Sequence, residues 1–492
     1  MTATEVLFIL LGYFSLLIII SFLTGRGAEN QAFFLGNKRS PWYVVSFGMI
    51  GASLSGVTFI SVPGWVGSSS FSYLQMVLGY LVGYVVIANI LLPLYYRLNL
   101  TSIYTYLDQR FGKVSYKTGA SFFLFSRIIG ASFRLYLVAN VLQLVMFDAW
   151  GVPFYVTVLV TIVLIWLYTF KGGIRTIVWT DTLQTLFMLS AVVLTVAFIA
   201  KDMQLNLPEL ISSVSDSELS RIWFFDNPKE KSFFFKQFLS GAFITIVMTG
   251  LDQDMMQKNL SCRNLGDAKK NVYWYGAAFL PVNLLFMSLG VLLFIFAQSH
   301  GMALPEKSDD LFPLIATQGY LPKIVSVFFI LGLIAAAYSS ADSALTSLTT
   351  SFSIDILDIQ HRYKSIIKQE QARKLVHIAI SLVLALVILV FSELNNDSVI
   401  SAIFTFAGYT YGPLLGLYAF GLYTKRVVAD QWVWIIALLS PLLCVVLNFY
   451  SEAWFFGYKI GFELLIFNGL FTFIGLWLIS KKNDALVAKS KK

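Results

Sequence analysis

The sequence predicts an all-α integral membrane protein with about thirteen transmembrane helices. Of its 492 residues, 57% are hydrophobic and only 13% are charged, and the mean hydropathy is +0.74. Soluble domains carry about 25% charged residues. The hydrophobic residues gather in runs long enough for a helix to cross a hydrocarbon layer of about 30 Å. We therefore expect most of the surface of this chain to face lipid.

Thirteen apolar stretches of this kind divide the chain. They lie near residues 5–24, 43–65, 71–95, 118–146, 153–170, 177–200, 235–256, 272–298, 324–354, 375–393, 398–423, 431–449 and 458–480. The first stretch has Glu5 before it, no basic leading segment and no small-residue cleavage site after it. We expect it to stay as a span and not to be removed as a signal peptide.

The charges between the spans alternate. Connections after the odd-numbered spans, together with the tail 481–492, hold most of the 35 Lys and Arg residues, whereas the opposite connections are rich in acids. By the positive-inside rule the C-terminus is cytoplasmic and the N-terminus lies outside. The net charge of +8 then reflects topology, so no nucleic-acid partner is implied. Two cysteines and three histidines exclude a disulfide framework and a histidine-rich metal site.

Two spans are expected to be interrupted. The second reads FGMIGASLSGVTFISVPGWVG, and the seventh, FLSGAFITIVMTGLDQDMMQ, is weakened at Gly241 and Gly250. Glycine and proline at this density make a poor continuous helix. Non-helical backbone at membrane depth survives only where protein or a wet cavity satisfies it, and freed carbonyls there can coordinate Na⁺. The two breaks lie five spans apart, which is typical of the corresponding helices of two inverted halves.

The ninth span carries a polar stripe around one carboxylate. At helical spacing one face collects the hydroxyl and carboxyl side chains of Ser339, Asp342, Ser343, Thr346 and Thr350. An ionised side chain at the bilayer centre costs at least about 2.5–3.5 kcal/mol, so such a face normally looks into a protein interior or a wet pathway. The alternative is helix packing, because Ser and Ala also let transmembrane helices approach closely. With Asp342 in the stripe, cation binding is the interpretation we favour.

Five ordered motifs resemble those of the sodium:solute symporter family, a branch of the LeuT-like fold. They are GASLSGVTFISVPG (51–64), TSIYTYLDQRFG (101–112), GGIRTIVWTDTLQTL (172–186), QDMMQK (253–258) and AAAYSSADSALTSL (335–348). Two of them, GASLSGVTF and AAAYSS, are most similar to bacterial sialic-acid symporters. The resemblance implies one transmembrane domain over 1–492, with a leading helix (5–24), two inverted five-helix repeats (43–200 and 235–423), two C-terminal helices (431–480) and the basic tail (481–492).

The resemblance also implies sodium sites. The main site would use the carbonyls of Gly51, Leu54 and Ala336 and the hydroxyls of Ser339 and Ser340. A second site in some members would fall on Asp181, Asp342 and Ser343. This chain departs from the sialic-acid pattern, which has a serine at the position of Asp342. For Asp181 the alternative is a helix cap near the cytoplasmic interface.

For the substrate, the resemblance places Ser53, Ser55 and Thr58 on the cavity side of the broken helix. Gln75 is a further polar candidate at the mouth of the third span. Arg127 and Arg134 lie seven residues apart on one face of the fourth span, where a guanidinium suits a carboxylate because its planar donors engage both oxygens. The sialic-acid carriers have their arginine at the position of Gly130, about one turn away. The alternative for either arginine is a side chain that extends along the helix so that its guanidinium lies at the membrane–water interface.

These observations predict a sodium-coupled symporter that imports a small organic solute by alternating access. The expected solute carries a carboxylate, such as a sialic acid or another organic anion; the alternatives are a neutral sugar, an amino acid or a vitamin, and more remotely a sensor on a transporter fold. The sequence offers no pairing of a nucleophile with a general base, so it gives no indication of an enzyme. We expect Na⁺ as the coupling ion and no organic cofactor. The expected partners are the lipid bilayer and a small solute, without nucleic acid. The expected location is a bacterial plasma membrane. A monomer would suffice, and the oligomeric state stays open.

Overall fold

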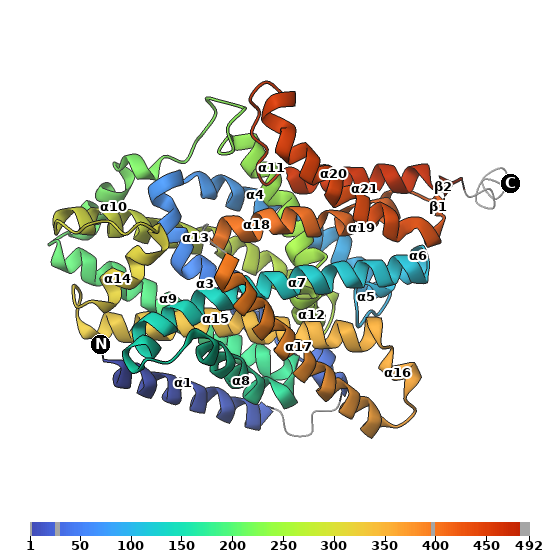
Figure 1. Ribbon diagram of the computed structural model, residues 1–492, viewed down its shortest axis with the longest axis horizontal. Coiled ribbons are helices and arrows are strands. Elements are labelled where there is room, and N and C mark those ends of the chain that lie inside the picture. Colours follow the sequence, from blue (N-terminus) through green and yellow to red (C-terminus); the bar gives the residue numbers. More distant parts are fainter. Residues whose placement is uncertain (1, 25–29, 395–398, 483–492) are drawn as a thin grey trace.

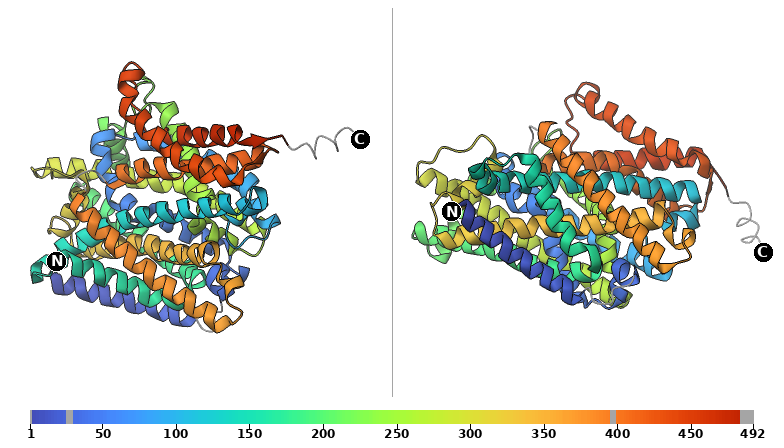
Figure 2. Two further views of the ribbon diagram at one scale, coloured as in Figure 1. Left: turned by 45° about the vertical axis from the view of Figure 1, so that its right-hand side comes forward. Right: turned by 60° about the horizontal axis from the view of Figure 1, so that its bottom comes forward.

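In the computed structural model, which describes residues 2–24, 30–394 and 399–482, long helices run side by side along one direction (Figure 1). The first helix, α1 (Ala3–Thr24), starts at one end of the bundle, and the last described strand, β2 (Ser480–Lys481), lies at the other end. Both views of Figure 2 keep α1 and the C-terminal helices α20 (Val433–Trp454) and α21 (Leu464–Leu478) at opposite edges, with the other helices between them.

Eight helical segments among the described residues are long and apolar enough to cross a membrane. They are Ala3–Thr24, Ser72–Arg97, Lys113–Trp150, Thr176–Asp202, Leu265–Ser299, Lys323–Ile356, Ile366–Glu393 and Asp430–Trp454. Two bent helix pairs raise the number to ten. The other three predicted spans coincide with the shorter apolar helices Phe154–Leu167, Gly412–Tyr423 and Leu464–Leu478. The all-α membrane class is confirmed, and the count of thirteen stays a prediction.

Most of the helices that build the bundle fall within the predicted stretches, and short helices also occupy some of the connections between them. They are α2 (Asn30–Leu35), α3 (Trp42–Ser69), α4 (Ser72–Val86), α5 (Leu92–Arg97), α6 (Thr105–Arg110), α7 (Lys113–Leu142), α8 (Phe154–Gly172), α9 (Ile174–Asp202), α10 (Leu207–Ser215), α11 (Phe234–Thr245), α12 (Gln253–Leu260), α13 (Leu265–Ser299), α14 (Leu311–Thr317), α15 (Lys323–Ser351), α16 (Ile359–Arg362), α17 (Ile366–Leu394), α18 (Val399–Thr410) and α19 (Gly412–Tyr423). A short strand, β1 (Val427–Val428), pairs antiparallel with β2.

The predicted break in the second span is confirmed. Helix α3 bends by 55° between Trp42–Gly56 and Thr58–Ser69. At the bend Ser55 has φ 46° and ψ 168°, a conformation that residues other than glycine rarely adopt. Strained backbone of this kind clusters at functional sites, where the surrounding structure enforces it. Ser55 itself is buried.

The seventh span is also broken. Phe234–Gly250 and Gln253–Leu260 meet at 64°, and a π-helical turn, η6 (Ile246–Gly250), precedes the bend. Asp252 caps the second half, because its side chain accepts hydrogen bonds from the backbone N–H groups of Asp254 and Met255 at 2.9 and 3.4 Å. The bend lies just after Gly250. Gly241 plays a different role, since a Cβ there would lie 2.1 Å from the Met76 carbonyl oxygen of α4.

Helix α3 packs against α9, α13 and α15 at the centre of the bundle, and α9 also packs against α15. Glycines permit the closest approach of α3 and α9. A Cβ at Gly48 would lie 3.0 Å from Asp181 Cβ, and one at Gly51 would lie 2.1 Å from Thr185 Oγ1. The polar stripe of α15, from Ser339 to Thr350, is almost completely buried in protein, as the cost of exposing it to hydrocarbon requires.

Candidate functional site

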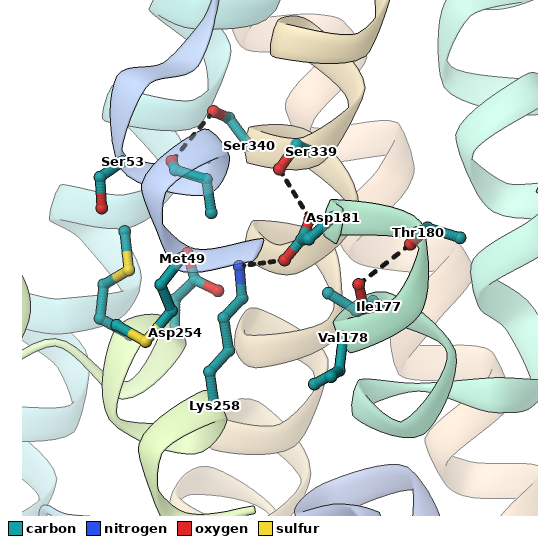
Figure 3. A network of polar contacts seen from close by, with 12 residues as sticks. Met49, Ser53, Ile177, Val178, Thr180, Asp181, Asp254, Lys258, Ser339 and Ser340 are labelled. Carbon is teal, nitrogen blue, oxygen red and sulfur yellow. Dashed lines mark hydrogen bonds and ion pairs between the residues drawn. The ribbon is translucent and has the colours of Figure 1, made fainter. Parts of the chain in front are cut away.

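Asp181 lies where α9, α12 and α15 meet. Ser339 Oγ donates a hydrogen bond to Asp181 Oδ1 at 2.6 Å, and Lys258 Nζ lies 2.7 Å from Asp181 Oδ2. The side chains of Asp181 and Lys258 are each 1% exposed. Figure 3 shows Lys258 reaching from α12 to the carboxylate, with Ser339 on the other side of it. The buried negative charge of Asp181 is thus balanced by a cation of the chain itself.

The five predicted groups of the main sodium site come from two helices that the structure brings together. Ser340 Oγ lies 3.3 Å from the Ala336 carbonyl oxygen and 3.5 Å from the carbonyl oxygen of Ala52, across the gap to α3. Leu54 and Ala336 are both fully buried. Neutral hydroxyl and carbonyl oxygens are the ligands that a hard monovalent cation prefers. The break in α3 and the serines of α15 together form a candidate cation site.

The residues of the second predicted site lie on α9 and α15, which pack against each other. Asp342 and Ser343 are buried in α15, and within the part of the chain that the structure describes the Ser343 hydroxyl makes no hydrogen bond. Asp181 faces Lys258 and Ser339. The helix-cap alternative for Asp181 is wrong, because α9 begins at Ile174 with Gly173 as its N-cap and Asp181 lies inside the helix.

A cavity lies beside the bend of α3. Its free volume is about 90 Å³, below the roughly 300–1,000 Å³ of typical small-molecule sites. It is lined by Ser53, Ser55, Thr58, Tyr73, Tyr80, Tyr84, Arg127, Arg134, Ile244, Thr245, Met248, Thr249, Met255, Tyr275, Phe279, Ile403 and Phe404. Five of the six residues predicted to bind substrate are in this set. The structure therefore gathers them around one space.

The two arginines of α7 differ in their partners. Arg127 forms an ion pair with Asp254 through Nη2, and its Nη1 lies 4.0 Å from Asp252 Oδ2. Tyr411 OH donates to the same Asp252 oxygen at 2.6 Å. By contrast, Arg134 Nη1 is buried and makes no hydrogen bond with any residue that the structure describes. Arg127 is held by protein carboxylates, and Arg134 keeps donor capacity beside the cavity.

Gln75 of α4 has hydrogen-bond partners within the protein. Its side chain is completely buried and does not line the cavity. Its Nε2 donates to the Ser232 carbonyl at 2.9 Å, and its Oε1 accepts from the backbone N–H of Phe224 at 3.2 Å. The side-chain amide therefore links α4 to the segment before α11. Both of its polar atoms are satisfied by backbone groups of that segment, as a buried polar side chain requires.

Sequence reasoning missed the charged residues at the second break. Asp252 and Asp254 balance Arg127, and Lys258 balances Asp181. The available signal was local, since GLDQDMMQK places three charges at the end of an apolar span and buried charges in membranes are normally paired.

Tyrosines form a second polar wall of the cavity. Tyr84 OH donates to Tyr275 OH at 2.7 Å, and Tyr275 OH lies 2.5 Å from Ser53 Oγ. Ser53 is thereby tied to α13. Thr58 also faces this cavity from the second half of α3. The wall offers hydroxyl groups and aromatic faces to a solute, next to the guanidinium groups of α7.

Comparisons with known proteins agree with these features. A model of the sodium:solute symporter family matches residues 33–434. The sodium/sialic acid symporter SiaT of Proteus mirabilis is 25% identical over 491 residues, which is 94% of each chain. The human sodium/iodide cotransporter is 26% identical over 434 residues, 84% of this chain and 65% of the relative's own length. A solved structure of a Na⁺-coupled sialic acid symporter in a substrate-bound, outward-open state shares the fold, with a TM-score of 0.82, 19% identity and coverage of 97% and 98% of the two chains.

Proposed function

Since this chain belongs to the sodium:solute symporter family, we propose that it couples the entry of Na⁺ to the import of a small carboxylate-bearing solute by alternating access. The single observation that carries the proposal is the cavity at the bend of α3. It brings Ser53, Ser55 and Thr58 of the broken helix together with Arg134, whose Nη1 makes no hydrogen bond with any residue that the structure describes. Both ligands would thus meet at one broken helix.

The cation half of the proposal rests on α3 and α15. At the bend the backbone of α3 leaves the helical pattern, so carbonyl groups near Ser55 lose their helical partners. Ser340 already lies between the carbonyls of Ala52 and Ala336. We assign Na⁺ to the carbonyls of Gly51, Leu54 and Ala336 and the hydroxyls of Ser339 and Ser340. For a second ion, Asp342 and Ser343 remain as candidate oxygen ligands on α15.

The solute half rests on Arg134. An unpaired guanidinium inside a membrane protein is expensive, and the carboxylates near α7 are engaged by Arg127. A solute carboxylate would supply the missing counter-charge. Ser53, Ser55 and Thr58 would position the rest of the solute through hydroxyl hydrogen bonds. The name of the Proteus mirabilis relative, a sodium/sialic acid symporter, is consistent with an anionic solute of this kind.

One observation favours a neutral solute as the second candidate. Tyr73, Tyr80, Tyr84 and Tyr275 line the cavity, and aromatic faces with hydroxyl tips suit the rings and hydroxyls of sugars as well as those of acids. In that case Arg134 would hydrogen-bond a carbonyl or hydroxyl group. Transport measurements separate the two candidates.

We also propose the location and topology. The multi-pass chain would lie in a bacterial plasma membrane with its N-terminus outside and its C-terminus in the cytoplasm. The described ends of the chain lie at opposite ends of the bundle, as an odd number of spans requires. The two breaks in α3 and in α11–α12 open the proposed repeats 43–200 and 235–423. The family and its structural relatives are transporters, which sets aside the enzyme alternative.

The test is uptake into proteoliposomes that contain the purified protein. Labelled sialic acids, monocarboxylates, sugars and amino acids would be offered with inward gradients of Na⁺ or K⁺. We expect uptake of a carboxylate that requires Na⁺. Uptake that proceeds equally with K⁺ would overturn the coupling ion, and Na⁺-dependent uptake of a neutral solute alone would overturn the substrate class.

A further inference from the structure

The strongest feature beyond this function is the lysine that faces Asp181. Lys258 lies on α12, the second half of the broken seventh span, 77 residues along the chain from Asp181. Its ammonium is completely buried 2.7 Å from Asp181 Oδ2. The other carboxylate oxygen accepts from Ser339 Oγ. Both oxygens of Asp181 therefore have a partner.

From this geometry we infer that the Lys258 ammonium fills the cation position at Asp181, so that no exchangeable Na⁺ binds this carboxylate. The inference rests on the proposed sodium coupling and refines it. An ammonium group and Na⁺ carry the same charge, and both bind carboxylate oxygens. A second cation beside Lys258 would meet an already neutralised carboxylate and a like charge at short range.

The tethered ammonium also fixes Ser339. Because the Ser339 hydroxyl donates its hydrogen bond to Asp181 Oδ1, the lone pairs of Ser339 Oγ remain to face a cation at the main site. Asp181 is thus a positioning residue for the main sodium site. The ion pair with Lys258 keeps the Asp181 carboxylate ionised. Loss of Lys258 would leave a buried, unbalanced carboxylate, and such a group recruits a cation or a proton.

The number of Na⁺ ions bound by each chain tests the inference. Radioactive Na⁺ would be counted on the purified, full-length protein at saturation, with no solute present. We expect Lys258→Met to bind one more Na⁺ than the wild type, and Lys258→Met/Asp181→Asn to return to the wild-type number. Lys258→Arg keeps a cation in place and is expected to bind the wild-type number.

Two results would overturn it. The first is a Lys258→Met protein that folds and binds no additional Na⁺. The second is a double variant that binds one Na⁺ fewer than the wild type although adding Ser340→Ala still weakens its remaining Na⁺ binding, because Asp181 would then hold a Na⁺ apart from the main site in the natural protein. This second comparison decides the question even if Lys258→Met alone does not fold, since the double variant removes both buried charges together.

Failure of the proposed function gives a different result. If the wild type binds no Na⁺ at all, the sodium coupling itself is wrong and this inference falls with it. If the wild type binds Na⁺ and Ser340→Ala weakens that binding while the double variant loses one Na⁺, the coupling stands and only the role of Lys258 is refuted.

Discussion

Ser340 on α15 and Ala52 on α3 meet across the centre of the bundle, with Ser340 Oγ 3.5 Å from the Ala52 carbonyl oxygen. The contact joins the polar stripe of α15 to the bend of α3. It is the place where a hydroxyl from one helix and freed carbonyls from another can surround a cation.

Ser340→Ala is expected to raise the half-saturating Na⁺ concentration by roughly 10- to 100-fold, because a hydroxyl bound to an ion contributes about 1.5–3 kcal/mol. Uptake at varied Na⁺ concentration measures it. Ser347→Ala is the matched control, since its buried hydroxyl donates within α15 to the Ala344 carbonyl and to no other residue that the structure describes. Equal Na⁺ dependence in both variants would argue against the site assignment.

Arg134→Lys is expected to weaken the apparent affinity for an anionic solute by about tenfold or more, because an ammonium cannot reproduce the bidentate fork. Arg127→Lys is expected to change affinity much less and to lower thermal stability, because Arg127 pairs with buried Asp254. Concentration dependence of uptake and thermal unfolding separate the two effects. An unchanged affinity in Arg134→Lys would make this arginine structural.

Asp342→Asn tests a second ion on α15. If Asp342 and Ser343 bind Na⁺, the substitution lowers the Hill coefficient for Na⁺ toward one and leaves substrate recognition intact. A second ion would roughly square the accumulation of a neutral solute, since each Na⁺ adds about 2.3 kcal/mol per 100 mV. A wild-type Hill coefficient of one, with a charge-to-solute ratio for a single ion, would reject this site.

Gly51→Ala is expected to lower stability by about 1–3 kcal/mol and to weaken Na⁺ binding, because the new Cβ would lie 2.1 Å from Thr185 Oγ1 and force α3 away from α9. Gly130→Ala is the control. No atom lies within 4 Å of its added Cβ, so helix propensity alone should leave it as stable as the wild type or more stable. Thermal unfolding with and without Na⁺ provides the comparison.

Asp309, which lies outside the membrane spans, is expected to make the folding stability depend on pH. Burial raises the pKa of its carboxyl above the usual 3.8, and Ser61 Oγ of α3 donates to it at 2.7 Å. The folded protein therefore holds this proton to higher pH than the unfolded chain does, so the contribution of Asp309 to stability falls as pH rises from about 3.8 through the raised pKa. Asp309→Asn should flatten that part of the stability profile. Thermal unfolding against pH measures it, and an unchanged slope would contradict the assignment.

The sequence alone could predict the class, the approximate spans and the two broken helices. Apolar length and the density of glycine and proline are local signals, and the bends near Ser55 and after Gly250 lie where those signals indicated. The buried stripe from Ser339 to Thr350 was equally predictable, because helical spacing puts its members on one face and lipid excludes them.

Only the tertiary structure decided the partners of the buried charges. Lys258 faces Asp181, Arg127 faces Asp254 and Gln75 fastens the segment before α11. In each case the partners lie far apart in the sequence, and their meeting depends on how bent helices are rotated and packed against one another. Periodicity shows which face of a helix is polar, but the counter-charge that the face meets is set by the neighbouring helix, because charge balance in a low-dielectric interior is a property of the whole packed bundle.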